Sequence, residues 1–163
     1  MNFSAHFTQD EFEHPAIIPV ECFSIFTYLC EEVLEPVRAF AGPIDITSGY
    51  RDAQSNAAAH GQPNSEHMAS ERWCAADFVP GSHYKTAREI FDWMRTNAFI
   101  PYHQLIYETD AQGGAVIHVS VNLDKLPARS VLQGATHNAE PYVSCDYVAY
   151  IAPGEQPAGA EES

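Results

Sequence analysis

The sequence HQLIYETDAQGGAVIHVSV, residues 103–121, decides the fold. Apolar and β-branched residues concentrate near both of its ends, which predicts one strand at His103–Glu108 and another at Val116–Val121. The link between them contains Gly113 and Gly114, and glycine pairs favour the tight turns of antiparallel hairpins. We therefore expect a hairpin whose two strands lie in one sheet.

Two short strands are predicted on the N-terminal side of this hairpin. Residues Ile44–Thr47 alternate apolar and polar side chains, and Ala75–Val79 form an apolar run that Pro80-Gly81 ends. The polar, Ala- and Asn-rich residues 52–74 between them predict a short helix and a long loop.

Helical periodicity marks two further segments. Apolar residues recur every three or four positions from Val20 to Phe40, with Pro36 expected to kink or interrupt the last turns before Gly42. A second helix is expected from about His83 to Asn97, with Ser82 as its N-cap. This order of elements predicts the α+β class, with helices packed on a small, mainly antiparallel sheet.

The two ends of the chain differ from this central part. Residues 1–19 contain two prolines and are expected to form an irregular lead-in, and residues 142–151 predict a further β segment. The tail is acidic and rich in Pro and Gly, which predicts disorder. The expected divisions are a core at 1–122, a β extension of the same domain at 123–152 and a disordered acidic tail at 153–163.

Composition and charge exclude several classes of protein. The chain has 163 residues, 45% of them hydrophobic, which suffices for one buried core. Eight Lys and Arg against 22 Asp and Glu give a formal net charge of −14, which opposes non-specific binding to nucleic acid or to anionic lipid. No apolar run is long enough to span a bilayer, and the N-terminus lacks the basic and apolar regions of a signal peptide. We therefore expect no nucleic-acid partner, no membrane insertion and a protein that is cytoplasmic when made.

The four cysteines are Cys22, Cys30, Cys74 and Cys145, and none of them forms a CxxC pair. Without an export signal, we expect four reduced thiols that pack as small apolar residues. A disulfide framework is the alternative, whereas a cysteine zinc site lacks the usual ligand spacing.

Three residues carry the side chains that metal sites need. His67 lies in the polar loop, and Asp77 and His118 lie within apolar strands. A carboxylate in an apolar strand is costly to bury unless it is paired or bound to a metal. Two imidazoles and one carboxylate form a three-ligand set that leaves zinc an open position. From the residues alone, a structural Asp77 with two unrelated histidines remains the alternative.

The order of several short motifs resembles the peptidase M15 family, in particular its branch of phage and bacterial peptidoglycan peptidases. The resemblance covers residues 6–122 and implies the fold shared by hedgehog and D-Ala-D-Ala peptidases. The motifs are SGYR (Ser48–Arg51), Asn56, SEH (Ser65–His67), AAD (Ala75–Asp77), QLIYE (Gln104–Glu108) and HVS (His118–Ser120).

This resemblance implies one Zn²⁺ per chain, held by His67, Asp77 and His118, although other divalent metals suit the same ligands. It implies that Arg51 is catalytic and binds a substrate carboxylate or the developing oxyanion, and that Ser65 helps to bind substrate. The alternatives are a structural ion pair for Arg51 and an ordinary loop-capping role for Ser65.

The chain departs from the family pattern at two places. Nine residues separate His67 from Asp77, where the family has six, and this longer loop is expected to reshape the entrance of the site. Ala115 stands where many members carry an acid three residues before the last histidine ligand. Glu108 matches an acidic position in this branch and is the expected general base. The alternative for Glu108 is an edge-strand carboxylate in solvent.

The function that the resemblance implies is hydrolysis of peptidoglycan stem peptides by a phage-associated zinc peptidase, either a D,D-carboxypeptidase or an L-Ala-D-Glu endopeptidase. The negative charge would repel an anionic cell wall, which favours docking to a larger assembly. The alternative is therefore a virion or tail component, with other virion proteins as partners, whose M15-like domain is weakly active or inactive. The protein would be virion-associated or released to the cell wall. A metal-free cargo- or sugar-binding module is the third alternative.

Overall fold

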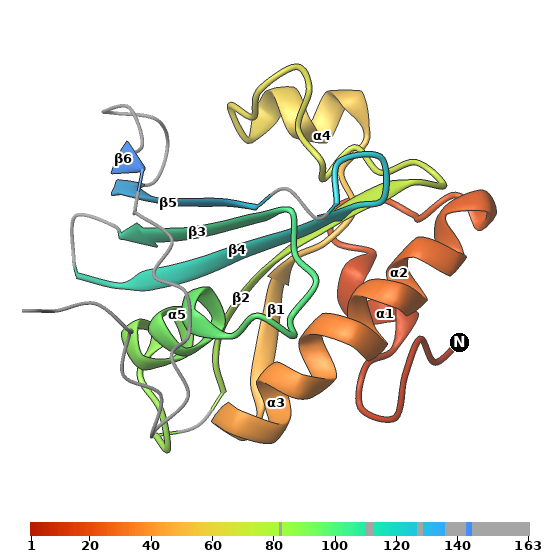
Figure 1. Cartoon of the computed structure of the whole chain (residues 1–163). Helices are drawn as coiled ribbons and strands as arrows, with labels where there is room; N and C mark the ends of the chain where they lie inside the picture. The colour runs from red at the N-terminus through yellow and green to blue at the C-terminus, as the bar shows by residue number, and fades with distance from the viewer. Residues whose placement is uncertain (82, 110–112, 127–128, 136–142, 145–163) are drawn as a thin grey trace, which may run out of the picture.

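The computed structural model describes residues 1–81, 83–109, 113–126, 129–135 and 143–144 (Figure 1). This part of the chain contains a six-stranded sheet with the strand order β1-β2-β4-β3-β5-β6. The strands are β1 (Ile44–Ser48), β2 (Trp73–Pro80), β3 (Gln104–Thr109), β4 (Ala115–Asn122), β5 (Ser130–Ala135) and β6 (Val143–Ser144). The helical elements are α1 (Gln9–Phe12), the 3₁₀ turn η1 (Val20–Cys22), α2 (Phe23–Leu29), the π turn η2 (Cys30–Leu34), α3 (Glu35–Ala41), α4 (Ala53–Ala58) and α5 (Ala87–Thr96). None of these helices is long and apolar enough to cross a bilayer.

The sheet is mixed, because β5 runs parallel to β3 while the other four pairings are antiparallel. The α+β class and the hairpin of β3 and β4 are confirmed. β5 lies within the expected β extension at 123–152, but the sequence pattern placed its strand at 142–151. β4 ends beside the start of β3, so a chain that crosses over to Ser130 runs along β3 in the same direction, with Gln104 opposite Ser130. Of the strand expected at 142–151, the structure describes only β6, and the tail at 153–163 lies outside the described residues.

Pro36 does not interrupt the long helical segment, which continues from Val20 to Ala41. Proline in an α-helix lacks an N–H, and its ring clashes with the carbonyl group four residues earlier. Here the π turn η2 precedes Pro36, with the Glu35 N–H bonded to the Cys30 carbonyl five residues back. The wider turn accommodates the ring, so Pro36 distorts the helix without ending it. Gly42, with a φ of 80°, follows the last helical residue, as expected.

The helix α5 begins later than the sequence pattern predicts. Thr86 is its N-cap, and it forms a capping box in which the Thr86 side chain accepts the Glu89 N–H and the Glu89 carboxylate accepts the Thr86 N–H. This reciprocal pair satisfies two backbone donors and sets the start at Ala87. Ser82, the expected cap, lies outside the described residues.

Helices cover one face of the sheet, and a polar loop crosses the other. Figure 1 shows α1, α2, α3 and α5 on one side, with α4 and the chain that follows it on the opposite side. The lead-in is irregular except for α1, but it belongs to the core: Phe3, Phe7 and Phe12 are all at most 2% exposed. The Phe12 and Phe26 rings lie 5.5 Å apart in an edge-to-face arrangement. Cys22, Cys30 and Cys74 are free and buried, as expected, and Cys145 lies outside the described residues.

Glu35 ties the lead-in to α3. Its carboxylate accepts hydrogen bonds from the Ser4 hydroxyl at 2.7 Å and from the His6 backbone N–H at 2.9 Å, and His6 Nδ1 lies 2.8 Å from its second oxygen. Burial raises the pKa of Glu35, but these hydrogen bonds outweigh it and lower the pKa below its ordinary value.

A carboxyl group whose pKa is lower in the folded state stabilises the fold above its unfolded pKa, and that stability is lost as pH falls through the folded pKa. We therefore expect the free energy of unfolding of the parent protein to fall more steeply between about pH 5 and pH 3 than that of Glu35→Gln. Urea unfolding at several pH values measures both slopes. Glu31→Gln, on the exposed side of the same helical segment, is the control and should keep the parent's slope. Equal slopes in the parent and in Glu35→Gln would contradict this link.

Candidate metal centre

Asp77 and His118 lie side by side because of the register between β2 and β4. The two residues are direct cross-strand partners, so their side chains stand on the same face of the sheet. Their neighbours along the strands, Ala76 and Ile117, alternate to the other face and are fully buried in the core. The strand pairing alone therefore presents a carboxylate and an imidazole to the face that the polar loop crosses.

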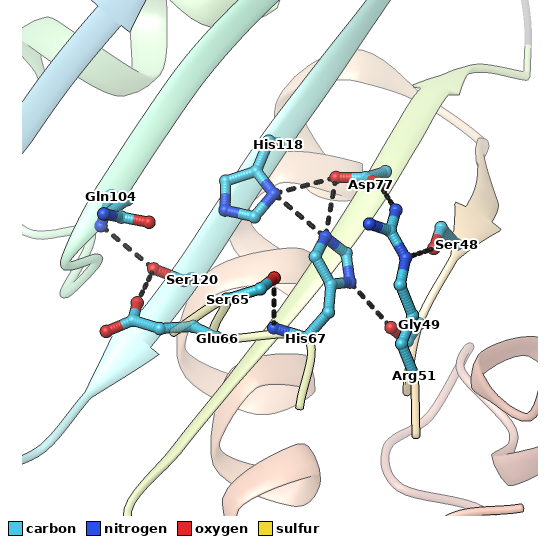
Figure 2. Close-up of polar contacts among 10 residues, drawn as sticks. All are labelled: Ser48, Gly49, Arg51, Ser65, Glu66, His67, Asp77, Gln104, His118 and Ser120. Carbon is cyan, nitrogen blue, oxygen red and sulfur yellow. Dashed lines mark hydrogen bonds and ion pairs between the residues drawn. The ribbon is translucent and has the colours of Figure 1, made fainter. Parts of the chain in front are cut away.

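His67 reaches this pair from the loop after α4, as Figure 2 shows. Its Nε2 lies 3.1 Å from Asp77 Oδ1 and 3.1 Å from His118 Nδ1, and the last two atoms are 2.8 Å apart. His67 is 2% exposed and His118 is 7% exposed. The three residues expected to bind a metal are thus brought together, with ligand atoms that all lie within 4.8 Å of one another.

The hydrogen bonding of His67 shows that these residues suit a cation. Its Nδ1 lies 2.7 Å from the Gly49 carbonyl oxygen, which can only accept, so Nδ1 carries the proton and Nε2 of the neutral ring is a lone pair. His118 Nδ1 can supply one proton to the three contacts, which leaves His67 Nε2 and Asp77 Oδ1 with facing lone pairs. A cation between the three atoms satisfies all of them. Two imidazoles and a carboxylate match the ligands of zinc and of several other divalent metals.

The Asp77 carboxylate is held in its charged form. Burial raises its pKa, but the positive charge that His67 carries when both ring nitrogens are protonated, and the hydrogen bonds from His118 and from that protonated ring, outweigh it, so the pKa lies well below its usual range. Its second oxygen, Oδ2, lies 2.8 Å from Arg51 Nη2. Arg51 thus makes the ion pair that the sequence left open as an alternative, and its role in binding substrate stays a prediction.

The segment Ser48–Arg51 contacts both Asp77 and His67 and fixes their positions. The Arg51 Nε donates to the Ser48 hydroxyl at 3.1 Å, and the Arg51 backbone N–H donates to the His67 carbonyl at 3.0 Å. Gly49 lies against the lead-in, where a Cβ would overlap the backbone of Phe12. Only glycine lets the chain pass this closely while its carbonyl group faces His67.

Asn56, another residue of the motif series, shapes the loop that carries His67. It is buried in α4, and its side-chain amide donates to the Gln62 carbonyl at 2.9 Å. The Gly61 N–H donates to the Asn56 carbonyl at 2.9 Å, and a Cβ on Gly61 would overlap the Asn56 side chain. Asn56 therefore fixes the turn through which the chain leaves α4.

The cluster opens into a hollow of about 480 Å³. Besides the three clustered residues, its lining includes Arg51, His60, Ser65, Ile106, Glu108 and Leu132. The Ser65 hydroxyl accepts the His67 N–H at 3.4 Å. Glu108 is half-buried, and β5 covers the outer side of its strand, so the alternative of an edge-strand carboxylate is wrong.

Glu108 stands within reach of the cluster. It pairs with Val116, while Ile106 pairs with His118, so Glu108 and His118 are diagonal neighbours on one face. Such residues lie roughly 7–8 Å apart, a distance that a glutamate side chain spans in large part. Its predicted role as a general base stays a prediction.

The longer connection between His67 and Asp77 lies away from this hollow. β2 begins at Trp73, which pairs with Asn122, and Arg72 forms an ion pair with Asp124 at 2.8 Å. Met68 and Trp73 line a second, smaller hollow of about 310 Å³, whereas residues 68–76 contribute nothing to the lining of the first. The connection therefore does not line the first hollow, so the expected reshaping of its entrance is not seen there.

Glu66, the middle residue of SEH, is a buried residue of the site that the sequence pattern did not predict. It accepts hydrogen bonds from Ser120 Oγ and Asn122 Nδ2, both at 2.5 Å, and lies 3.0 Å from His103 Nδ1. Burial raises its pKa, but these three contacts outweigh it and lower the pKa below its ordinary value. The sequence carried one indication of a buried polar partner. In β4, the polar residues His118, Ser120 and Asn122 alternate with apolar ones and so lie on one face of the strand.

Comparison with known protein families gives one finding. The family model described as Peptidase M15 matches residues 5–119 of the chain. The matched range contains the three clustered residues, Arg51 and Glu108. A comparison with curated proteins found no match.

We expect the protein equilibrated with Zn²⁺ and then dialysed to retain about one zinc per chain, because two imidazole nitrogens and a carboxylate oxygen lie within 4.8 Å of one another. His67→Ala and His118→Ala should each lose this zinc, as measured by elemental analysis, with circular dichroism to confirm folding. His14→Ala, at an exposed position of the lead-in, is the control and should retain the metal. Equal zinc content in all three folded variants would show that the cluster is not the binding site.

Proposed function

The chain belongs to the peptidase M15 family, and from this we infer that the His67–Asp77–His118 cluster holds a catalytic zinc ion in a peptidase. The observation that carries the proposal is the convergence of two imidazole nitrogens and a carboxylate oxygen at the wall of an open hollow. When the His67 ring is neutral, its Nε2 and Asp77 Oδ1 are both acceptors 3.1 Å apart, and a cation between them satisfies both.

The residues of this chain divide the work between holding the metal and moving protons. When bound, the zinc ion supplies Lewis-acid chemistry and lowers the pKa of water. The Gly49 carbonyl keeps the His67 ring in the orientation that presents Nε2, and Arg51 keeps the second Asp77 oxygen turned away. Such outer partners set the geometry and affinity of metal ligands.

Glu108 is the proposed general base. Its carboxylate takes a proton from the attacking water as the C–O bond forms, and the proton passes to the amine as the C–N bond breaks. The position of Glu108, diagonal to His118 on the same face, supports this role. Ala115, where many family members carry an acid, has no side chain that can replace it.

Arg51 and Ser65 are the proposed substrate-binding residues. Arg51 uses Nε and Nη2 for Ser48 and Asp77, so its remaining N–H groups are donors for a substrate carboxylate or an oxyanion. Ser65 accepts one hydrogen bond from the His67 backbone and has a hydroxyl proton to donate into the hollow.

The proposed substrates are peptidoglycan stem peptides, cut by D,D-carboxypeptidase or L-Ala-D-Glu endopeptidase activity, and the proposed setting is a bacteriophage. The support for both is the resemblance of the motif series to that branch of the family. The second candidate is a virion or tail component that binds zinc and hydrolyses little or nothing, and the specific observation in its favour is Ala115.

The zinc-loaded protein should cleave a synthetic stem pentapeptide that begins with L-Ala-D-Glu and ends in D-Ala-D-Ala, with the products identified by mass spectrometry. Release of D-Ala or separation of L-Ala identifies which bond is cut. Glu108→Gln should lower kcat by about 100-fold or more while zinc content is unchanged, because a general base contributes about 10²–10⁴ in rate. Glu71→Gln, exposed in the loop before β2, is the control and should keep the parent's rate.

Two results would contradict this proposal. An intact peptide after long incubation with zinc-loaded protein would favour the virion component. Cleavage by Glu108→Gln at the parent's rate would remove Glu108 from the mechanism and leave the peptidase assignment standing.

A further inference from the structure

We propose that Glu66 is a positioning residue, whose buried carboxylate ties the loop that carries His67 to the strand that carries His118. This inference rests on the proposed function, because it concerns how the same metal site is held. Glu66 directly precedes the proposed ligand His67, but its own side chain faces away from the metal site.

The carboxylate of Glu66 is almost fully engaged by donors from β4 and from the residues next to β3 and β4. Its Oε2 accepts the Ser120 hydroxyl and lies 3.0 Å from His103 Nδ1, and its Oε1 accepts the Asn122 amide. Lys125 Nζ lies 3.6 Å from Oε1. Glu66 is only 6% exposed, and a buried carboxylate is retained only where such partners compensate its lost hydration.

The donors are placed so that they fix His67 relative to His118. Ser120 and Asn122 follow His118 at alternate positions of β4, so they stand on the same face of the sheet. Glu66 and His67 are consecutive residues. The hydrogen bonds from Ser120 and Asn122 of β4 to Glu66 therefore restrict the distance between the rings of His67 and His118. The strand that presents one histidine therefore also holds the backbone that presents the other.

The remainder of the loop offers few other anchors. Gln62, Pro63 and Asn64 are exposed, and Ser65 is half-buried. Past Ser65, the chain is held at Glu66 by β4, at the His67 carbonyl by the Arg51 N–H and at the His67 ring by the Gly49 carbonyl. Loss of the Glu66 carboxylate removes the attachment to the strand that carries His118.

Glu66 is not placed to act as a base itself. Figure 2 shows its carboxylate turned toward Ser120, on the opposite side of the chain from the His67 ring, which points toward Asp77 and His118. Its two oxygens are already in contact with the side chains of His103, Ser120 and Asn122. Its effect on the metal therefore acts through His67.

The test is the affinity of the protein for Zn²⁺, measured by competition with a chelator of known affinity. Glu66→Ala should weaken zinc binding by at least about 10-fold, in the range found when outer partners of metal ligands are removed. Glu66→Gln keeps the shape and part of the hydrogen bonding, so it should recover part of this loss. Val33→Ala, in the core of the helical layer, is the control for a general loss of stability and should leave zinc affinity unchanged.

A second readout needs no metal. In the metal-free parent, the ¹⁵N shifts of the His67 ring should show a proton on Nδ1, because this atom donates to the Gly49 carbonyl. Glu66→Ala should give a mixture of the two ring tautomers, and Val33→Ala should not. This measurement decides the positioning role even where Glu66→Ala binds too little zinc to titrate.

The outcomes separate this inference from the proposed function. Zinc affinity within about twofold of the parent in folded Glu66→Ala, or an equal loss in Val33→Ala, would overturn the positioning role and leave the zinc peptidase intact. A parent that binds no zinc would overturn the proposed function, and the His67 tautomer would then decide the role of Glu66. Should Glu66→Ala fail to fold, zinc affinity and the His67 tautomer are measured in Glu66→Gln and in Ser120→Ala. Values equal to the parent's in both variants would overturn the positioning role.

Discussion

The contact between the His67 ring and the Gly49 carbonyl oxygen, 2.7 Å long, determines which ring nitrogen faces the sheet. With Nδ1 committed to that carbonyl group, Nε2 meets a carboxylate and a second imidazole, and the polarity of the whole site follows. Several distant parts of the chain serve this contact. The lead-in seats Gly49 against Phe12, β1 delivers the segment, and the loop after α4 brings His67 to it.

The sheet contributes the opposite constraint, which is a fixed frame for the other two side chains. Asp77 and His118 belong to β2 and β4, the second and third strands of the sheet, where each strand has a partner on both sides. One face of these strands is packed on the helices, so a shift in register by one residue would place Ile117 or Ala76 in the site and a charge in the core. Packing of the opposite face against the helices therefore fixes the register that places Asp77 beside His118.

The sequence predicts most of what depends on local pattern and little of what depends on distant contacts. The hairpin of β3 and β4, β1 and the end of the long helix at Gly42 follow from alternation, periodicity and a turn residue. β5 does not, because its place is set by where β4 ends, and the start of α5 was misplaced although Thr86 and Glu89 carried a capping signal. The three clustered residues were found through their order among other motifs, since their spacing alone is uninformative. Glu66 was missed because its partners lie 37 to 56 residues further along the chain.

The parallel pairing of β5 with β3 also bears on how a peptide can enter. Many proteins bind an extended peptide as one more strand at a sheet edge, through backbone hydrogen bonds. Beside Glu108 that edge is already occupied, because Gly134 of β5 pairs with it. A peptide therefore cannot pair with β3 as an added strand, whereas β1, at the other end of the sheet, keeps an edge whose Thr47 and Ser48 line the hollow. Beside Glu108, the side chains that line the hollow would have to hold the proposed substrate, and a backbone ladder would be possible only along β1.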